Sequence, residues 1–409
     1  MSHRRAVLTS TCIGAVTAGL LIATAVTGPE RAPGDRVPTS TAQRPPEAGP
    51  APGPAPVGSD RDSRAGSSDS VPFGAFLGSG PEGVRRIDEL RRWLGGREPT
   101  VGHTYLPGDR WENIEGRPRF LRPWAEWRKA DEDRMFVLNV PMAEYNEAGL
   151  PDREVDRVLR VGAAGGYDRH FRTLAERLVR LGVPDTVVVL GWEMNGTTYG
   201  HRCGPNPEAW QEYWRRIVAT MRSVPGQEFR FDFAPARGRD AIPWTRCYPG
   251  DRYVDIIGMD SYDQPPGETF REQVRQPYGL QAQVDFAEKH GKEISYPEWG
   301  LFREGDNPDY VRSMLDWIRE NEPAYHTITD YCPHGVMRCD GNPESSRVFR
   351  SVMSEPGREP EPRPEPEPAP DLPWWQPRPF EFCVDLGDWL EELLDVEPPC
   401  FRFDGGLPR

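Results

Sequence analysis

A short, largely apolar segment followed by an amphipathic helical segment recurs along this chain between residues 71 and 354. The clearest apolar segment is Thr186–Leu190 (TVVVL), which carries no charge, as expected of a strand buried on both faces of a parallel sheet. Parallel strands need helical crossovers between them, and the chain supplies these. The alternation therefore predicts an α/β fold.

The chain contains eight of these predicted strands. The predicted strands are Val71–Gly78, Thr100–Leu106, Met135–Pro141, Thr186–Leu190, Phe229–Ala234, Val254–Met259, Glu293–Gly300 and Tyr325–Tyr331. The main predicted helices are Pro81–Leu94, Tyr167–Gly182, Pro207–Met221, Phe270–Lys289, Asn307–Glu320 and Pro343–Met353, with a loop and helix over Trp111–Lys129. Eight units over about 280 residues predict a (β/α)8 TIM barrel. An open doubly wound sheet is the alternative, although no glycine-rich phosphate loop follows the first strand.

The N-terminus is typical of an exported protein. Residues 1–26 combine the basic start MSHRR, an apolar run over Ala6–Val26 and the cleavage pattern Ala23-Thr24-Ala25, which predicts a signal peptide. The run is almost long enough to cross a bilayer, so an uncleaved N-terminal anchor is the alternative. Residues 27–70, rich in Pro, Gly, Ala and Ser, form a linker. We expect a secreted protein, or one tethered to the membrane or cell wall.

The C-terminal part is acidic. The predicted domain at 71–354 is followed by a Pro/Glu linker at 355–372 and a small acidic segment at 373–409, with helical spacing over Leu386–Val396. This segment is either a surface-docking module or a disulfide-closed knob that packs on the barrel. The formal net charge is −14, and no basic stripe is present, so we expect no nucleic-acid partner. We also expect the protein to be a monomer.

Removal of the signal peptide leaves six of the seven cysteines, an even number that suits an oxidising compartment. Proximity along the chain predicts the pairs Cys332–Cys339 and Cys383–Cys400. Cys203 and Cys247 would then pair across two loops. This is one of the fifteen connectivities that six cysteines allow.

Two acids stand where strands end. Glu193 follows the fourth predicted strand and Glu298 ends the seventh, and the carboxyl ends of barrel strands form one ligand-binding face. Two facing carboxyl groups suit hydrolysis of a glycosidic bond, in which one is protonated and the other ionised. Mutual repulsion and burial against Trp192 and Trp299 would separate their pKa values. A buried ion pair is the structural alternative, and the spacing leaves open whether a covalent intermediate can form.

Three motifs carry a family resemblance. They are, in chain order, Glu193-Met194-Asn195-Gly196, the segment 248–262 (YPGDRYVDIIGMDSY) and Pro297-Glu298-Trp299-Gly300. They resemble the motifs of glycoside hydrolase family 26, the β-mannanase family within the clan of (β/α)8 retaining glycosidases. The resemblance spans Val71–Met353. It implies that Glu193 is the acid/base, Glu298 the nucleophile and Tyr262 its orienting partner, with retention of configuration.

Two departures from the family pattern bear on the substrate. Trp192 stands where the family usually has His, and Tyr331 stands near the position of a Trp that often floors a subsite. The resemblance implies an endo-acting glycosidase on a β-mannan or a related β-glycan polysaccharide or oligosaccharide, with endo-1,4-β-mannosidase activity as one form.

Further candidates for sugar contact lie near predicted strand ends. They are Trp111, Trp192, Trp299, Tyr331, His103, Asn139, Asn195 and Arg237. Each has a structural alternative, since barrels bury tryptophans and hydrogen-bond their histidines. The chain lacks H-E-x-x-H and His-x-x-x-His, so we expect no metal and no cofactor, which disfavours a metal-dependent deacetylase or peptidase. A cell-surface barrel that binds glycans without cleaving them is the other rival.

Overall fold

The computed structural model describes residues 71–302, 305–354, 380–383 and 400–403. The strands of the main sheet are β1 Phe73–Phe76, β2 Val101–Tyr105, β3 Met135–Val140, β4 Val187–Leu190, β5 Arg230–Phe233, β6 Ile256–Gly258, β7 Ser261–Tyr262, β8 Glu293–Gly300 and β9 His326–Thr329. The helices are α1 Gly80–Trp93, α2 Trp111–Ile114, α3 Pro118–Lys129, α4 Asp152–Ala163, α5 Asp168–Arg180, α6 Pro207–Arg222, η1 Trp244–Arg246, α7 Phe270–Arg275, α8 Leu280–His290, α9 Pro308–Asn321 and α10 Pro343–Met353.

The sheet closes on itself. Strands β1 to β6 pair in sequence order, β6 also pairs with β8, β8 with β9, and β9 with β1, all in parallel. The short β7 continues the line of β6 beyond Met259 and Asp260 and pairs with the far end of β8. The result is a closed eight-stranded parallel barrel, which confirms the predicted TIM barrel and excludes the open sheet.

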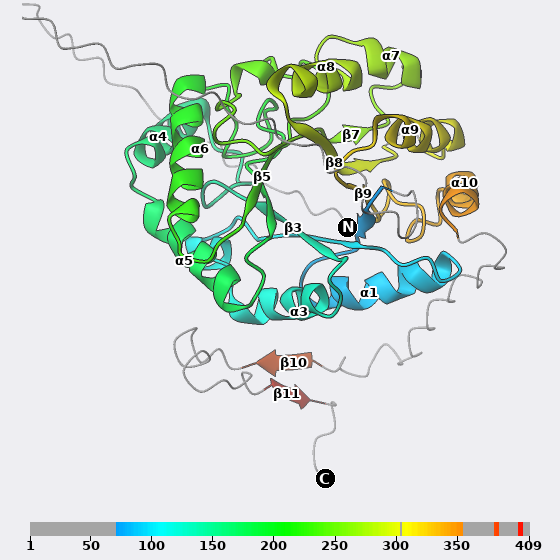
Figure 1. The fold of residues 1–409 in the computed structure, drawn as a ribbon, viewed down its shortest axis with the longest axis horizontal. Helices are drawn as coiled ribbons and strands as arrows, with labels where there is room; N and C mark the ends of the chain where they lie inside the picture. Colours follow the sequence, from blue (N-terminus) through cyan, green and yellow to red (C-terminus); the bar gives the residue numbers. More distant parts are fainter. Residues whose placement is uncertain (1–70, 303–304, 355–379, 384–399, 404–409) are drawn as a thin grey trace, which may run out of the picture. The chain divides into compact units, whose positions relative to one another are not determined.

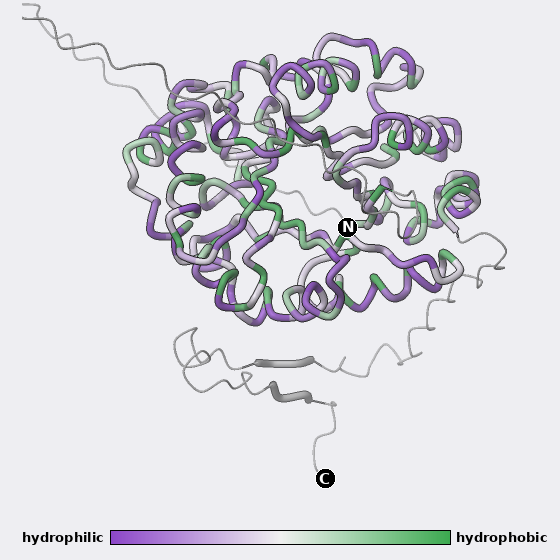
Figure 2. The backbone as a smooth tube through the Cα atoms, in the orientation of Figure 1, coloured by the Kyte–Doolittle hydropathy of each residue, from purple (hydrophilic) through white to green (hydrophobic). Residues whose placement is uncertain are grey.

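The helices surround the strands (Figure 1), and the hydrophobic stretches concentrate on the central strands (Figure 2). The main core lies between these two layers and contains fully buried Trp124, Trp210 and Trp214. A smaller cluster fills the barrel interior around Val137, Val187 and Val189. As predicted, every residue of β4 is buried.

One predicted helix is divided. The sequence predicted a single helix over Phe270–Lys289, but α7 ends at Arg275 and α8 begins at Leu280. Gln276 has an extended backbone (φ −58°, ψ 154°) because the following Pro277 clashes with a helical conformation at the preceding residue. Helix α4, which was not predicted, begins directly after Pro151 and carries Asp152 and Glu154 in its first turn.

Some predictions fall outside the described residues. These include the signal peptide or anchor, both linkers and the helix predicted over Leu386–Val396. Of the C-terminal segment, the structure describes an antiparallel pair, β10 Phe380–Cys383 and β11 Cys400–Phe403, in which Cys383 lies opposite Cys400. Within the described part of the chain, no helix has the length and apolar character needed to cross a membrane.

Two of the predicted disulfides are formed. Cys203 pairs with Cys247 and Cys332 with Cys339, at sequence separations of 44 and 7 residues. The first bond ties the loop after β4 to the end of η1. It therefore crosses between two of the loops at the carboxyl ends of the strands.

The two bonds should contribute unequally to stability, because a longer closed loop restricts the unfolded chain more. We expect Cys203→Ala/Cys247→Ala to lower the free energy of unfolding by about 4 kcal/mol and Cys332→Ala/Cys339→Ala by about 2 kcal/mol. Guanidinium unfolding of the two double variants measures the difference. A larger loss from the Cys332–Cys339 pair would contradict this account.

Candidate active site

Glu298 lies near the end of β8 and is almost completely buried. The Tyr262 hydroxyl donates to its Oε2 at 2.8 Å, and the Asn139 amide nitrogen donates to its Oε1 at 3.2 Å. Tyr105 provides a further side-chain hydrogen bond. Because these donors come from β7, β3 and β2, the carboxyl group depends on the closed barrel for its surroundings.

A buried polar chain supports Asn139. When the Asn139 amide donates to the Glu298 carboxylate, its Oδ1 faces His103 Nε2 at 2.9 Å, so Nε2 carries the proton. His103 Nδ1 lies 2.9 Å from Thr327 Oγ1, and the Thr327 hydroxyl donates to the Pro297 carbonyl. Burial lowers the pKa of His103 to about 4, which keeps the ring neutral. Asn139 therefore holds Glu298 and His103 supports Asn139, while the expected contact of these two residues with sugar stays a prediction.

Glu193 occupies a turn directly after β4. Gly191 (φ 60°) and Glu193 (φ 47°) both adopt left-handed conformations, and the Glu193 amide donates to Ala234 O at 2.8 Å. A non-glycine residue in this region is strained, at a cost of order ~1 kcal/mol. The surrounding loop must hold the acid in this conformation.

Two side chains from the same loop do so. The Asn195 amide donates to Ala236 O at 2.9 Å and accepts from Ala236 N at 2.9 Å, which joins the loops after β4 and β5. His201 Nε2 lies 2.8 Å from Trp192 O. Asn195 is fully buried and both ends of its amide bond to Ala236, so it has a structural role here, and its expected contact with substrate stays a prediction.

The two glutamates differ in their electrostatic surroundings. Burial, followed by the charges of Glu298 and Asp240, raises the pKa of Glu193 to about 8. Burial also raises the pKa of Glu298, but hydrogen bonds from Tyr105, Tyr262 and Asn139 oppose the shift. Among the described residues, the Glu193 carboxyl group has no such donor. The proton of the pair therefore resides on Glu193, and the carboxylate on Glu298.

A third buried acid, Asp260, lies between β6 and β7. Burial raises its pKa well above the usual range, and the charges of Glu298 and Glu193 add to the effect. Neither carboxyl oxygen has a hydrogen-bond partner in the described part of the chain. Asp260 is therefore a neutral acid beside the pair.

A cleft of about 580 Å³ opens over Glu298. Its walls include the aromatic side chains Tyr105, Tyr145, Trp192, Tyr199 and Tyr331. Tyr145 and Tyr331 are 58% and 48% exposed, more than other large hydrophobic side chains of the described residues. The predicted residues Trp192 and Tyr331 therefore lie on the cleft wall.

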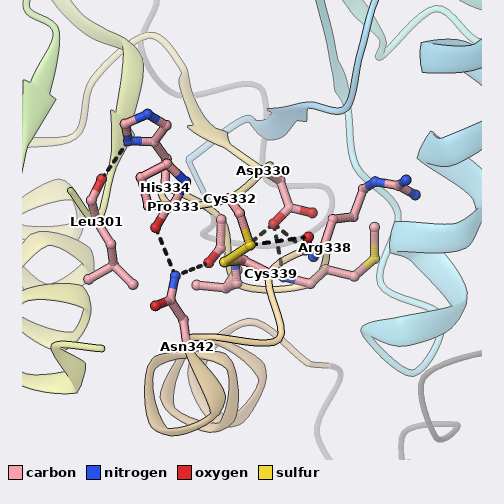
Figure 3. The surroundings of a disulfide bond; sticks show 11 residues. Leu301, Asp330, Cys332, Pro333, His334, Arg338, Cys339 and Asn342 are labelled. Carbon is pink, nitrogen blue, oxygen red and sulfur yellow. Dashed lines mark hydrogen bonds between the residues drawn. A yellow bond between two sulfur atoms is a disulfide. The ribbon is translucent and has the colours of Figure 1, made fainter. Parts of the chain in front are cut away.

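The loop that carries Tyr331 is tightly held (Figure 3). Asp330 Oδ1 accepts from the amides of Val336, Met337 and Arg338, at 2.7, 2.9 and 3.2 Å. The Asn342 amide donates to two carbonyls of the same loop, and the Cys332–Cys339 bond closes it. Tyr331 thus projects from a fixed support although it is half exposed.

Three further predicted sugar contacts are not brought to the cleft. Trp299 is fully buried and its Nε1 donates to His326 Nδ1 at 3.2 Å, because it follows Glu298 on the strand and faces the helices. Trp111 stacks on His170 with ring centroids 4.1 Å apart. The Arg237 guanidinium donates to Ser261 Oγ and to the carbonyl of Tyr262, so it supports the Tyr262 segment.

Sequence reasoning missed several cleft residues. Tyr105 lies two positions after His103 on β2, so strand alternation could have placed it inside the barrel. Tyr145 and Tyr199 lie in irregular loops, where no periodicity marks a side chain that faces the cleft. Within residues 71–302 and 305–354, no group of three or more His, Cys, Asp or Glu side chains is arranged to hold a metal ion.

A closed (β/α)8 barrel with a protonated and a hydrogen-bonded glutamate at one mouth is the architecture of a glycosidase. The sequence model of glycosyl hydrolase family 26 matches residues 170–303, which contain Glu193, Tyr262 and Glu298. The match covers 134 of the 409 residues, and over this part the chain is similar to glycosyl hydrolase family 26.

Solved structures with the same fold are mannanases. A modular endo-β-1,4-mannanase from Cellulomonas fimi is 21% identical, with a TM-score of 0.53 over 70% of this chain and 71% of that one. A family 26 β-mannanase from Bacteroides ovatus is 17% identical, with a TM-score of 0.52 over 70% and 90%. A Bacillus subtilis mannanase is 14% identical, with a TM-score of 0.50 over 72% and 91%. A comparison with curated protein sequences gave no match.

The coupling between the two acids can be measured. We expect Glu298→Gln to lower the pKa of Glu193 from about 8, because the neighbouring negative charge is removed, while burial keeps it above 4.5. Carboxyl 13C NMR titration of Glu193 gives the value. Glu147→Gln, at the cleft wall, is the control and should leave the Glu193 titration unchanged. An unaltered Glu193 pKa in Glu298→Gln would show that the acids are not coupled.

Proposed function

We propose that this protein is an exported, retaining endo-β-glycosidase that hydrolyses β-mannan or a related β-glycan. The observation that carries the proposal is the division of labour between two glutamates: the partly buried Glu193 holds a proton, and the buried Glu298 carboxylate accepts three hydrogen bonds. The similarity of the fold to mannanases supports mannan as the substrate class.

The first half of the reaction uses a protonated Glu193 and an ionised Glu298. A Glu298 oxygen attacks the anomeric carbon while Glu193 gives its proton to the departing glycosidic oxygen. The Tyr262 hydroxyl, 2.8 Å from Glu298 Oε2, and the Asn139 amide, 3.2 Å from Oε1, orient the carboxylate for attack. A covalent glycosyl ester on Glu298 and a shortened sugar chain are the products.

The second half follows from the change of charge. Once Glu298 is esterified, its negative charge no longer raises the pKa of Glu193. Glu193, now ionised, takes a proton from a water molecule, whose oxygen attacks the anomeric carbon and releases Glu298. Two displacements at one carbon retain its configuration.

Single replacements of the two acids distinguish this enzyme from a barrel that only binds glycans. We expect Glu193→Gln to lower kcat on β-mannan by about 10²–10⁴-fold, because the leaving oxygen loses its proton donor. Glu298→Gln should lower it at least as much, because no ester can form. Product release is followed by chromatography, with Glu147→Gln as the matched cleft-wall control. Unchanged release in both variants would contradict the proposal.

We further propose that the protein is exported and that its N-terminal segment is removed. The motif Ala23-Thr24-Ala25 and two disulfides within the described residues support this. N-terminal sequencing of the protein from culture supernatant should begin at Val26. A variant without residues 2–26 should remain inside the cell. Full-length protein recovered only from membranes would favour the uncleaved anchor instead.

A further inference from the structure

His334 lies in the disulfide-closed loop after β9 and joins that loop to the residue that follows β8 (Figure 3). The Leu301 amide donates to the His334 carbonyl at 3.0 Å. His334 Nδ1 lies 2.8 Å from the Leu301 carbonyl oxygen and donates to it, because a carbonyl oxygen can only accept. A Cβ atom at Gly300 would lie 2.8 Å from the His334 carbonyl oxygen, so the loop approaches β8 as closely as a glycine allows. These contacts fix the His334 ring beside the strand that carries Glu298.

The His334 ring stands between Tyr262, the hydrogen-bond partner of Glu298, and Tyr331 on the cleft wall. Its centroid lies 4.9 Å from that of Tyr262 and 5.2 Å from that of Tyr331. The Phe302 ring lies on the same histidine, with centroids 5.5 Å apart. Rings at these separations pack against one another and restrict each other's rotation. Since Tyr262 is only 8% exposed, His334 forms part of the wall that encloses it.

The direction of the Tyr262 hydroxyl is important for Glu298. The hydroxyl donates to Glu298 Oε2 at 2.8 Å, so its oxygen accepts from the Thr329 hydroxyl, also at 2.8 Å. Tyr262 stands on β7, which is only two residues long and gives the side chain little backbone support. A hydrogen bond weakens when its donor turns away from the acceptor. Packing around the phenol ring must therefore keep this bond aligned.

We propose that His334 is a positioning residue for the nucleophile, and that its ring keeps the Tyr262 hydroxyl directed at Glu298. The inference rests on the proposed function, because it takes Glu298 as the group that attacks the sugar. His334 is not among the described residues that line the cleft, so it acts through Tyr262 and not on the substrate. The loop that carries Tyr331 on the cleft wall thereby also supports the catalytic carboxylate.

Two variants separate the ring of His334 from its hydrogen bond. His334→Asn keeps a side-chain N–H donor near Leu301 but removes the ring, and His334→Phe keeps a ring but removes the donor. We expect His334→Asn to lower kcat on β-mannan by about 3- to 10-fold, because a misdirected hydrogen bond is weakened and not lost. His334→Phe should keep most of the activity.

His290→Asn is the matched control for these variants. His290 is a partly exposed histidine at the end of α8, where its ring pairs with Asp251, and kcat should be unchanged when it is replaced. Unchanged kcat in His334→Asn would overturn the proposal. A loss in His334→Phe as large as that in His334→Asn would overturn it as well, because the ring would then not be the part that matters.

A double-mutant cycle shows whether His334 acts through Tyr262. Tyr262→Phe removes the hydroxyl and should lower kcat by about 10- to 100-fold, the loss expected from one hydrogen bond to a charged group. If His334 only orients that hydroxyl, adding His334→Asn to Tyr262→Phe should cause no further loss. An equal factor of loss in both backgrounds would show a separate structural effect of His334 and would overturn the proposal.

The titration of Glu298 is a second measurement, and it needs no substrate. Burial raises the pKa of Glu298, and hydrogen bonds from Tyr105, Tyr262 and Asn139 oppose that rise. We therefore expect His334→Asn to raise the Glu298 pKa and Tyr262→Phe to raise it further, as followed by carboxyl 13C NMR. A Glu298 titration that does not respond to His334→Asn would contradict the proposal. The other titratable groups around Glu298 are the same in all these variants, and they are Glu193, Asp260, Tyr105, Tyr199 and Tyr331.

The NMR measurement also separates this inference from the proposed function. If β-mannan is not hydrolysed but the Glu298 titration responds to His334→Asn as expected, the proposed mannan activity fails and the positioning role stands. If β-mannan is hydrolysed but neither kcat nor the titration responds to His334→Asn, the reverse holds.

Discussion

The burial of the Glu298 carboxyl group is the constraint on which the active site depends. A carboxylate removed from water is stable only if donors replace its hydration, and the barrel supplies them from three other strands. Tyr105 and Asn139 lie far from Glu298 along the chain, on β2 and β3, and they reach it only because the sheet closes. Closure of the barrel therefore supplies the hydrogen bonds that stabilise the ionised Glu298 carboxylate.

The surroundings of the Glu193 carboxyl group differ from those of Glu298. It stands on a turn rather than within a strand, and its carboxyl group receives no hydrogen bond from the described residues, whereas its backbone amide is anchored to Ala234. Asn195 and the Cys203–Cys247 bond secure the turn from the flanking loops. A rigid backbone and a partly buried carboxyl group with two acidic neighbours, Glu298 and Asp240, keep a proton available close to neutral pH. In the proposed mechanism, loss of the negative charge on Glu298 lowers the pKa of Glu193, so that the same side chain acts first as acid and later as base.

The sequence predicted the barrel, the strands that carry both acids and two disulfides, because these depend on local periodicity and on proximity along the chain. Alternation within a strand could also have separated Glu298, which faces inward, from Trp299, which faces the helices. The roles of His103 and Asn139 could not be read in this way, because their partners, Thr327 and Glu298, lie far along the chain. Tyr145 escaped prediction because it projects from a loop whose conformation depends on tertiary contacts.

The cleft has a floor, formed by residues of the strands, and a rim, formed by residues of the loops. This division bears on which substrate the cleft can accept. The floor consists of Glu298 together with Tyr262 and Asn139, which donate hydrogen bonds to its carboxylate, and these residues lie on strands. The rim consists of loop aromatics such as Tyr145 and Tyr331, together with Trp192 in place of the family's usual His. Tyr331 is held by its own disulfide-closed loop, so its position does not rely on the barrel strands. Loop residues can therefore change which sugar is accepted while the hydrolytic chemistry below them is conserved by the barrel itself.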